Sequence, residues 1–283
     1  MRKFALITGG SKGLGARLVQ RFWLDGYSLV VVARNHVDIY SIFDQLPKLR
    51  DQSAMVMGCD LADAAKVATM LDAIKAKIPH LDVLVNNAAI QGPIGPLGEN
   101  DLFTWQQTLQ VNLLAPVALC RGLIPLMKRP DGASIINLSG GGATGPRVNF
   151  SSYATSKAGL VRFSETIADE LKCEGIRVNC IAPGAMKTAM LKELLVKGDA
   201  AGGREVSLAS EVFEKGGASM DRVADLALFL ASDASKGISG RLISAVWDNW
   251  EEWPKHLDEI SRSDVYTLRR ISGRDRGLVW GDK

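Results

Sequence analysis

The sequence predicts a doubly wound α/β domain in which a mostly parallel, seven-stranded sheet carries helices on both faces. Short runs rich in β-branched residues alternate along the chain with longer segments that have apolar residues at helical spacing. The short runs are apolar throughout, which is typical of strands that are buried on both faces. Helices between such strands make parallel connections and cover both faces of the sheet.

The expected strands occupy residues 4–8, 28–33, 54–60, 81–88, 133–139, 176–184 and 241–247. The main helices are expected at 14–25, 63–78, 101–128, 153–174 and 220–232. Residues 1–247 then form one domain, and the glycine-containing insertion 186–219 departs from its alternating pattern. Residues 248–283 form a C-terminal extension that we expect to pack on the domain or on a neighbouring subunit.

Composition limits the classes of function. The chain has 283 residues, of which 47% are hydrophobic and 23% charged, with a net charge of +3. This charge is too small to indicate a nucleic acid or membrane partner. No apolar run approaches the roughly 20 residues of a membrane helix, and the run at 4–7 is too short for a signal peptide. Four cysteines without a CxxC pair and three scattered histidines predict neither disulfides nor a metal site, and they favour a cytoplasmic protein.

A glycine-rich turn follows the first strand. Gly9, Gly13 and Gly15 lie in the segment TGGSKGLG, directly before a helix. Glycines let a backbone approach a pyrophosphate, and a helix N-terminus offers free N–H groups to it. The spacing differs from G-x-G-x-x-G, so on its own the turn also fits an ordinary loop.

Later segments complete a pattern. In order along the chain they are Thr8–Gly15, Asp60-Leu61, Asn86-Asn87-Ala88-Ala89, Asn112, Tyr153-x-x-x-Lys157 and Pro183-Gly184. This set resembles the short-chain dehydrogenase/reductase family in its compact, single-domain form, over about residues 3–246. The resemblance implies a Rossmann-type fold, a nicotinamide cofactor, a small carbonyl or alcohol substrate, and a homodimer or homotetramer. The extended branch of the family has a glycine where this chain has Lys12.

The charges near the turn favour NADP over NAD. An NAD site has an acid at the end of the second strand to bind the ribose 2′-hydroxyl. Here Arg34 stands just past that end, the first acid after it is Asp38, and Lys12 lies in the turn. Two cations suit a 2′-phosphate. The alternative is that both are solvated surface residues.

The resemblance assigns further cofactor contacts. Asp60 and Leu61 would flank the adenine, Asn87 would hold the adenosine ribose region or support the turn, and Thr188 would touch the nicotinamide carboxamide. The expected cofactor site consists of Gly9, Ser11, Lys12, Gly13, Leu14, Gly15, Arg34, Asp60, Leu61, Asn87, Ala88, Tyr153, Lys157, Pro183, Gly184 and Thr188.

Tyr153 and Lys157 are the expected chemical pair. Residues four apart share one helix face, and an ammonium near a phenol favours the phenolate. Lowering a tyrosine pKa by roughly three units corresponds to about 4 kcal/mol. Tyr153 would then exchange a proton with a carbonyl or alcohol oxygen. By resemblance, Lys157 also binds the nicotinamide ribose, and Asn112 holds a water that links Lys157 to solvent.

The serine that usually assists such a tyrosine is displaced. The family has it thirteen residues before the tyrosine, where this chain has Gly140, and Ser139 lies one residue earlier. The flexible run Gly140–Gly142 would let Ser139 turn toward the substrate oxygen; alternatively, the glycines make room for a bulky substrate and the serine role has lapsed. We favour Ser139. Ser151 and Ser152 precede the expected tyrosine helix and are expected to cap it, and nothing in the spacing supports Thr144.

The remaining segments are less specific. Residues 189–218 are expected to form a mobile lid over the substrate, with glycines as hinges, or else a disordered surface loop. The extension is rich in tryptophan and carries four arginines that either grip an anionic group of the substrate or belong to a tail packed on protein: Arg269, Arg270, Arg274 and Arg276.

The sequence thus predicts an NADP-dependent enzyme that interconverts a carbonyl and an alcohol, with Tyr153, Lys157, Asn112 and Ser139 as its catalytic residues. One alternative is a nucleotide-sugar epimerase or dehydratase on the same scaffold. Another is a non-catalytic NADP-binding sensor.

Overall fold

The computed structural model describes residues 2–47, 51–278 and 280. Its centre is a seven-stranded sheet with the order β3-β2-β1-β4-β5-β6-β7, in which all six neighbouring pairs are parallel. The strands are Phe4–Thr8 (β1), Ser28–Ala33 (β2), Ala54–Gly58 (β3), Val83–Asn86 (β4), Ala133–Leu138 (β5), Ile176–Ala182 (β6) and Leu242–Ser244 (β7). The predicted doubly wound α/β fold is confirmed, and all seven expected strands are present.

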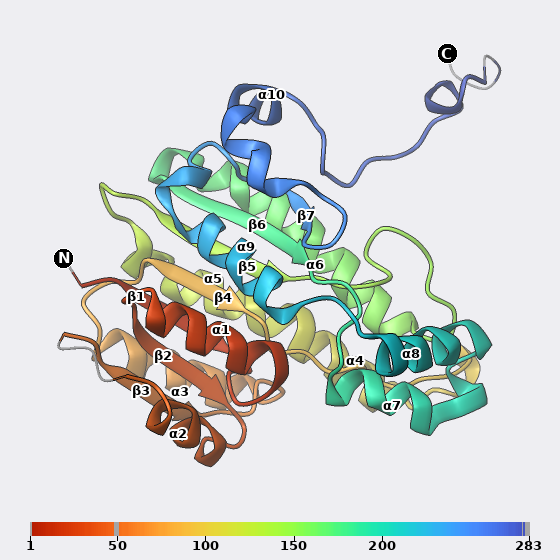
Figure 1. Ribbon diagram of the computed structural model, residues 1–283, viewed down its shortest axis with the longest axis horizontal. Coiled ribbons are helices and arrows are strands. Elements are labelled where there is room, and N and C mark those ends of the chain that lie inside the picture. Colours follow the sequence, from red (N-terminus) through yellow and green to blue (C-terminus); the bar gives the residue numbers. More distant parts are fainter. Residues whose placement is uncertain (1, 48–50, 279, 281–283) are drawn as a thin grey trace.

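The helices connect the strands (Figure 1). They are Gly13–Leu24 (α1), Val37–Asp44 (α2), Ala64–Lys75 (α3), Leu102–Leu109 (α4), Ala115–Met127 (α5), Ser151–Glu170 (α6), Ala189–Lys197 (α7), Gly203–Lys215 (α8), Met220–Ala231 (α9) and Leu257–Arg262 (α10). Short 3₁₀ turns include Lys172–Glu174 and Trp250–Lys255.

Two apolar cores lie on opposite faces of the sheet. Alternate residues of β1 point to opposite sides, so Ile7 packs with α1 and α9, whereas Leu6 packs with α3 and α5. Every residue of β1 and β2 is buried. This two-sided burial accounts for the continuous apolar runs in the sequence.

Residues Leu102–Met127 form one continuous helical stretch through α4 and α5. By length and composition alone this stretch qualifies as a candidate membrane span, which the sequence reading did not anticipate. In the structure its α5 part packs against α3 and the sheet within the second core. The α5 part is thus a core helix, whereas Leu102 and Phe103 at the start of α4 are exposed.

The segment expected to form the lid consists of two helices, α7 and α8. Gly198 ends α7, and Gly202 and Gly216 bound α8, all three with positive φ. An apolar cluster joins both helices to Phe150 and Tyr153 through Leu191, Leu194 and Val212.

The C-terminal extension lies against the domain as far as Leu268. Trp250 and Trp253 are buried in the core on the α1 and α9 side. The Arg241 guanidinium donates to the carbonyl oxygens of Ile260 and Ser263. The backbone N–H of Leu242 in β7 donates to the Tyr266 carbonyl (2.8 Å). The described residues beyond Leu268 run away from the domain (Figure 1).

Candidate active site

The sequence-predicted residues meet at the carboxyl edge of the sheet, where β1 lies between β2 and β4. Successive strands diverge in chain order at this point, and ligands of doubly wound sheets bind there. The glycine-rich turn leaves β1 at this edge, and the segment that begins with Asn87 leaves β4 beside it.

Asn87 and Thr8 hold the glycine-rich turn in place. The Asn87 side-chain amide donates to the carbonyl oxygens of Thr8 (2.9 Å) and Gly9 (3.3 Å). The Thr8 hydroxyl accepts from the backbone N–H groups of Asn87 (3.0 Å) and Ala88 (3.1 Å). A Cβ on Gly15 would lie 1.9 Å from the Gly9 carbonyl oxygen, so only glycine permits this close turn.

The start of α1 is open for an anion. Among the described residues no side chain caps its first turn, which also contains no acid. A Cβ on Gly13 would find only the Thr188 methyl group, at 3.5 Å. Backbone N–H groups and the helix dipole therefore face the turn without competition, and Thr188 lies beside them.

The two cations proposed for a 2′-phosphate are both on the surface. Lys12 is 76% exposed and forms an ion pair with Asp38 of α2 at 3.4 Å. Arg34 is exposed at the end of β2. The Cys59 N–H donates to the Ala33 carbonyl, and this bond brings Asp60 and the buried Leu61 to the same corner. Asp38, the first acid after the second strand, thus lies beside Lys12.

Tyr153 and Lys157 lie on the buried face of α6. Lys157 is only 2% exposed, and its Nζ donates to the Leu138 carbonyl at the end of β5 (2.7 Å). The same Nζ lies 5.6 Å from the centre of the Tyr153 ring. Lys157 thereby fixes α6 to the strand end from which Ser139 and Gly140 emerge.

Burial dominates the ionisation of both groups. It raises the pKa of the Tyr153 phenol, and the nearby Arg147 charge opposes this rise. This direction is opposite to the one expected from the sequence. Burial also lowers the pKa of Lys157 to about 8.

Asn112 lies in a π-helical segment, Gln110–Leu114, between α4 and α5. It is fully buried, and its side-chain amide both accepts from the Ile90 N–H and donates to the Ile90 carbonyl (2.9 Å each). Its Nδ2 also donates to the Ser156 hydroxyl (3.1 Å), which donates to the Tyr153 carbonyl (2.7 Å). Asn112 therefore joins the segment after β4 to the helix that bears Tyr153. Single-turn π segments occur often at functional sites.

Ser139 and Gly140 differ in how their side-chain positions lie relative to the Tyr153 hydroxyl. The Ser139 hydroxyl is buried, and no group in the described residues hydrogen-bonds to it. A Cβ on Gly140 would lie 2.6 Å from the Tyr153 hydroxyl. Residue 140 is therefore the position from which a side chain would meet the phenol. Whether Ser139 binds the substrate oxygen remains a prediction.

The two serines at the start of α6 do not cap it. Phe150 precedes the helix, and no side-chain cap forms there within the described chain. The Ser151 hydroxyl instead accepts from the Trp105 indole N–H (3.0 Å). The Ser152 hydroxyl is buried with no hydrogen-bond partner among the described residues. The expected capping role of both residues is wrong, because tertiary packing takes up their side chains.

Pro183 and Gly184 follow β6 and lead into α7. Gly184 has φ +79°, and a Cβ on it would lie 2.7 Å from a Val246 methyl group. Thr188 caps α7 by accepting from the Leu191 N–H (3.2 Å). These residues place the start of α7 beside the glycine-rich turn.

Two residues of this region were not predicted from the sequence. Ser156 lies inside the Tyr153–Lys157 motif and links it to Asn112. Arg147, in the loop before α6, lies over the rings of Phe150 and Tyr153. A single arginine in a loop carries no periodicity, so only the folded structure reveals it.

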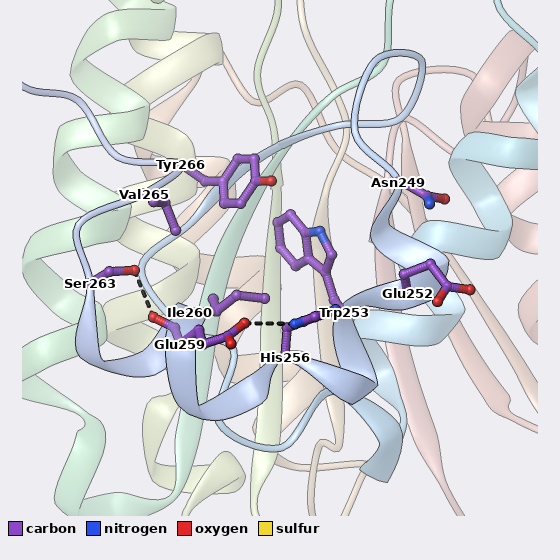
Figure 2. A pocket seen from close by; sticks show the side chains of 9 residues that line it. All are labelled: Asn249, Glu252, Trp253, His256, Glu259, Ile260, Ser263, Val265 and Tyr266. Atoms are coloured by element: carbon purple, nitrogen blue, oxygen red, sulfur yellow. Dashed lines mark hydrogen bonds and ion pairs between the residues drawn. The ribbon is translucent and has the colours of Figure 1, made fainter.

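A cavity of about 500 Å³ lies outside this region, in the C-terminal extension (Figure 2). Its lining includes Trp253, His256, Glu259 and Tyr266 and shares no residue with the Tyr153 region. His256 Nδ1 and Glu259 face each other at 2.6 Å along one side of it. In the described ranges no three His, Cys, Asp or Glu side chains come together to hold a metal ion.

Comparison with known proteins agrees with the family that the sequence motifs indicate. The family model described as short chain dehydrogenase matches residues 3–197. D-threitol dehydrogenase from Mycolicibacterium smegmatis is 33% identical over 239 residues, 84% of this chain and 89% of that protein. 3beta-hydroxysteroid dehydrogenase 1 from Eggerthella lenta is 33% identical over 241 residues, 84% of this chain and 90% of that protein. The crystal structure of YwfH, an NADPH-dependent reductase involved in bacilysin biosynthesis, superposes with a TM-score of 0.77 at 27% identity, covering 87% of this chain and 97% of that one.

Proposed function

Because this chain belongs to the short-chain dehydrogenase/reductase family, we propose that it interconverts a carbonyl and an alcohol on a small molecule with NADP as cofactor. The observation that carries the proposal is the pairing of Tyr153 and Lys157 on the buried face of α6, next to the end of β5. Their position at the carboxyl edge of the sheet is where a doubly wound fold binds its ligand.

The residues present fit such a cofactor. The uncapped N-terminus of α1 and the close turn at Gly9 and Gly15 offer N–H groups to a pyrophosphate. Lys12 and Arg34 would hold the 2′-phosphate, and Asp60 and Leu61 would border the adenine. Thr188, 3.5 Å from the Gly13 Cβ position, would reach the nicotinamide end. The NADPH dependence stated for YwfH supports the same choice.

The bound cofactor supplies the hydride chemistry, and the protein supplies position and protons. Tyr153 would hold the proton at its hydroxyl and give it to the substrate oxygen during reduction, or accept it during oxidation. Lys157, anchored on the Leu138 carbonyl, would favour the phenolate and bind the nicotinamide ribose. Ser139 would donate its otherwise unpartnered hydroxyl to the substrate oxygen. Asn112 would hold the water that connects Lys157 with solvent.

An apolar carbonyl compound is the substrate class that this site favours. Leu191, Leu194 and Val212 of α7 and α8 belong to the same apolar cluster as Tyr153. The charged side chains next to this cluster are Arg147 and Glu205, which pair with each other. A matched screen with a cyclic apolar ketone and a polyol-derived ketose tests this class. A higher kcat/KM for the apolar ketone is expected, and the reverse order would move the substrate toward that of D-threitol dehydrogenase. We also propose that the protein is cytoplasmic and forms a homodimer or homotetramer.

Tyr153→Phe tests the chemistry. It removes the proton donor and is expected to lower turnover by at least about 100-fold, with NADPH binding unchanged by tryptophan fluorescence. Tyr40→Phe, at an exposed tyrosine, is the control. Full turnover by Tyr153→Phe would overturn the mechanism. NADPH binding without any turnover of carbonyl compounds by the unmodified protein would favour the sensor, and turnover of nucleotide sugars alone would favour the epimerase or dehydratase.

A further inference from the structure

Arg147 packs against the proposed catalytic tyrosine. It lies in the loop between β5 and α6, and its side chain is 15% exposed. Its guanidinium carbon is 3.9 Å from the centre of the Phe150 ring and 5.4 Å from the centre of the Tyr153 ring. A guanidinium at these distances is attracted to the faces of both rings, and this attraction strengthens where water is excluded.

The other side of Arg147 is attached to the lid. Its Nη2 donates to Oε2 of Glu205 at 2.7 Å, and the Glu205 side chain is 19% exposed. Glu205 lies in the first turn of α8. A charge-assisted hydrogen bond of this kind is strong and directional. Arg147 therefore connects one end of α8 to the aromatic side chains at the start of α6.

Two of the glycines after Ser139 lie beside this side chain. A Cβ on Gly142 would lie 3.3 Å from the Arg147 Cβ, and a Cβ on Gly141 would lie 4.0 Å from its Cδ. Gly142 also has φ +92°, which side chains rarely adopt. Gly141 and Gly142 thus border Arg147, and a Cβ on Gly142 would in addition lie 2.7 Å from the Ala154 methyl group of α6.

We propose that Arg147 is a positioning residue that holds a positive charge at the Tyr153 ring and couples that charge to the lid through Glu205. This inference rests on the proposed function of Tyr153 as acid/base. A cation beside the ring stabilises the phenolate more than the neutral phenol. Two cations among the described residues lie against the Tyr153 ring, Arg147 and Lys157, and Glu205 is the acid behind Arg147. A displacement of α8 would therefore displace the Arg147 charge through this ion pair.

Titration of Tyr153 tests the charge without any substrate. The chain has four tyrosines, so ¹³Cζ-tyrosine NMR resolves them, and Tyr153→Phe assigns the signal. In Arg147→Gln the pKa of Tyr153 is expected to rise by about one unit, whereas Arg147→Lys keeps the charge and recovers at least half of the shift. Arg204→Gln removes an exposed arginine next to Glu205 and is the matched control. An unchanged titration in Arg147→Gln would overturn the proposal.

Amide exchange tests the coupling to the lid. Glu205→Gln keeps Arg147 but breaks the ion pair, so exchange in the first turn of α8 is expected to speed up about tenfold, the effect of one charge-assisted hydrogen bond. Equal exchange in both proteins would refute the lid connection. Both experiments are independent of turnover. If both experiments give the expected results while Tyr153→Phe keeps full turnover, the role of Tyr153 as acid/base is wrong, but Arg147 still places a charge at its ring and connects it to α8.

Discussion

Gly140 faces the hydroxyl of Tyr153: a Cβ at residue 140 would lie 2.6 Å from the phenol oxygen. A side chain at this position would push against the reactive atom, so glycine keeps the space beside the phenol free. A substrate oxygen that approaches Tyr153 therefore has two candidate protein partners, the phenol itself and the buried, unpartnered hydroxyl of Ser139.

Ser139→Ala is expected to lower kcat about 100-fold if Ser139 stabilises the developing charge on the substrate oxygen. The free energy of unfolding should change little, because within the described chain the hydroxyl has no hydrogen bond to lose. Steady-state kinetics and thermal unfolding of the same preparation check both statements. Wild-type kcat in this variant would show that the serine role has lapsed.

Gly140→Ala is the companion variant. The added methyl group would crowd the Tyr153 hydroxyl, and overpacking of this kind costs typically about 1–3 kcal/mol. We expect both stability and kcat to fall. A neutral effect on both would mean that the loop moves away from Tyr153 easily.

The buried Lys157 makes stability depend on pH. Burial lowers its pKa to about 8 in the folded chain from 10.5. Between these two values the unfolded chain binds the proton more strongly, so this residue's contribution to the free energy of unfolding rises with pH. Below about pH 8 the ammonium is buried at a cost, and deprotonation removes that cost. From pH 7 to 9.5 the contribution rises by about 2 kcal/mol.

Lys157→Met removes that contribution while keeping an unbranched side chain. The free energy of unfolding of each protein is measured with urea at pH 7 and at pH 9.5. From the lower to the higher pH, the wild-type value is expected to rise by about 2 kcal/mol relative to that of the variant. Parallel pH dependence in the two proteins would show that Lys157 titrates normally.

The proposed 2′-phosphate site predicts a selective loss of affinity. Lys12→Ala and Arg34→Ala should each weaken NADPH binding about tenfold, the effect of one charge-assisted hydrogen bond, and leave NADH binding unchanged. Asp38→Asn should strengthen NADPH binding, because it removes the acid that pairs with Lys12. Lys66→Ala, an exposed lysine paired with Asp63, is the control. Fluorescence titration measures the affinity for NADPH and for NADH in each variant. Equal losses of affinity for both nucleotides would argue against the phosphate site.

The extension provides a matched pair of tryptophans. Trp253 is 4% exposed and its ring lies 4.4 Å from that of Tyr266, whereas Trp247 is 86% exposed. Trp253→Ala should cost about 3–5 kcal/mol of unfolding free energy, and Trp247→Ala should stay within about 0.5 kcal/mol. Equal effects on the melting temperature would contradict the packing of the extension on the domain.

Most of the sheet could be predicted because strands buried on both faces leave continuous apolar runs. The apolar runs do not define where each strand ends: the strand expected at 81–88 is Val83–Asn86, because the N–H groups of Asn87 and Ala88 donate to the Thr8 hydroxyl. The helix α8 was interpreted as part of a lid loop because glycines flank it, although they mark its ends. The π-helical turn at Asn112 and the stacking of Arg147 depend on contacts between distant segments, which a sequence pattern does not carry.

The hydrogen bond between Leu242 and Tyr266 bears on the behaviour of the chain in concentrated solution. β7 is the last strand of the sheet, and the outer border of such a strand presents unpaired N–H and carbonyl groups to which another molecule can add a strand. The extension lies along this border and uses the Leu242 N–H itself. A chain cut before residue 248 would expose that border together with the apolar surface under Trp250 and Trp253. Such a truncated chain is expected to aggregate at lower concentration than the full chain.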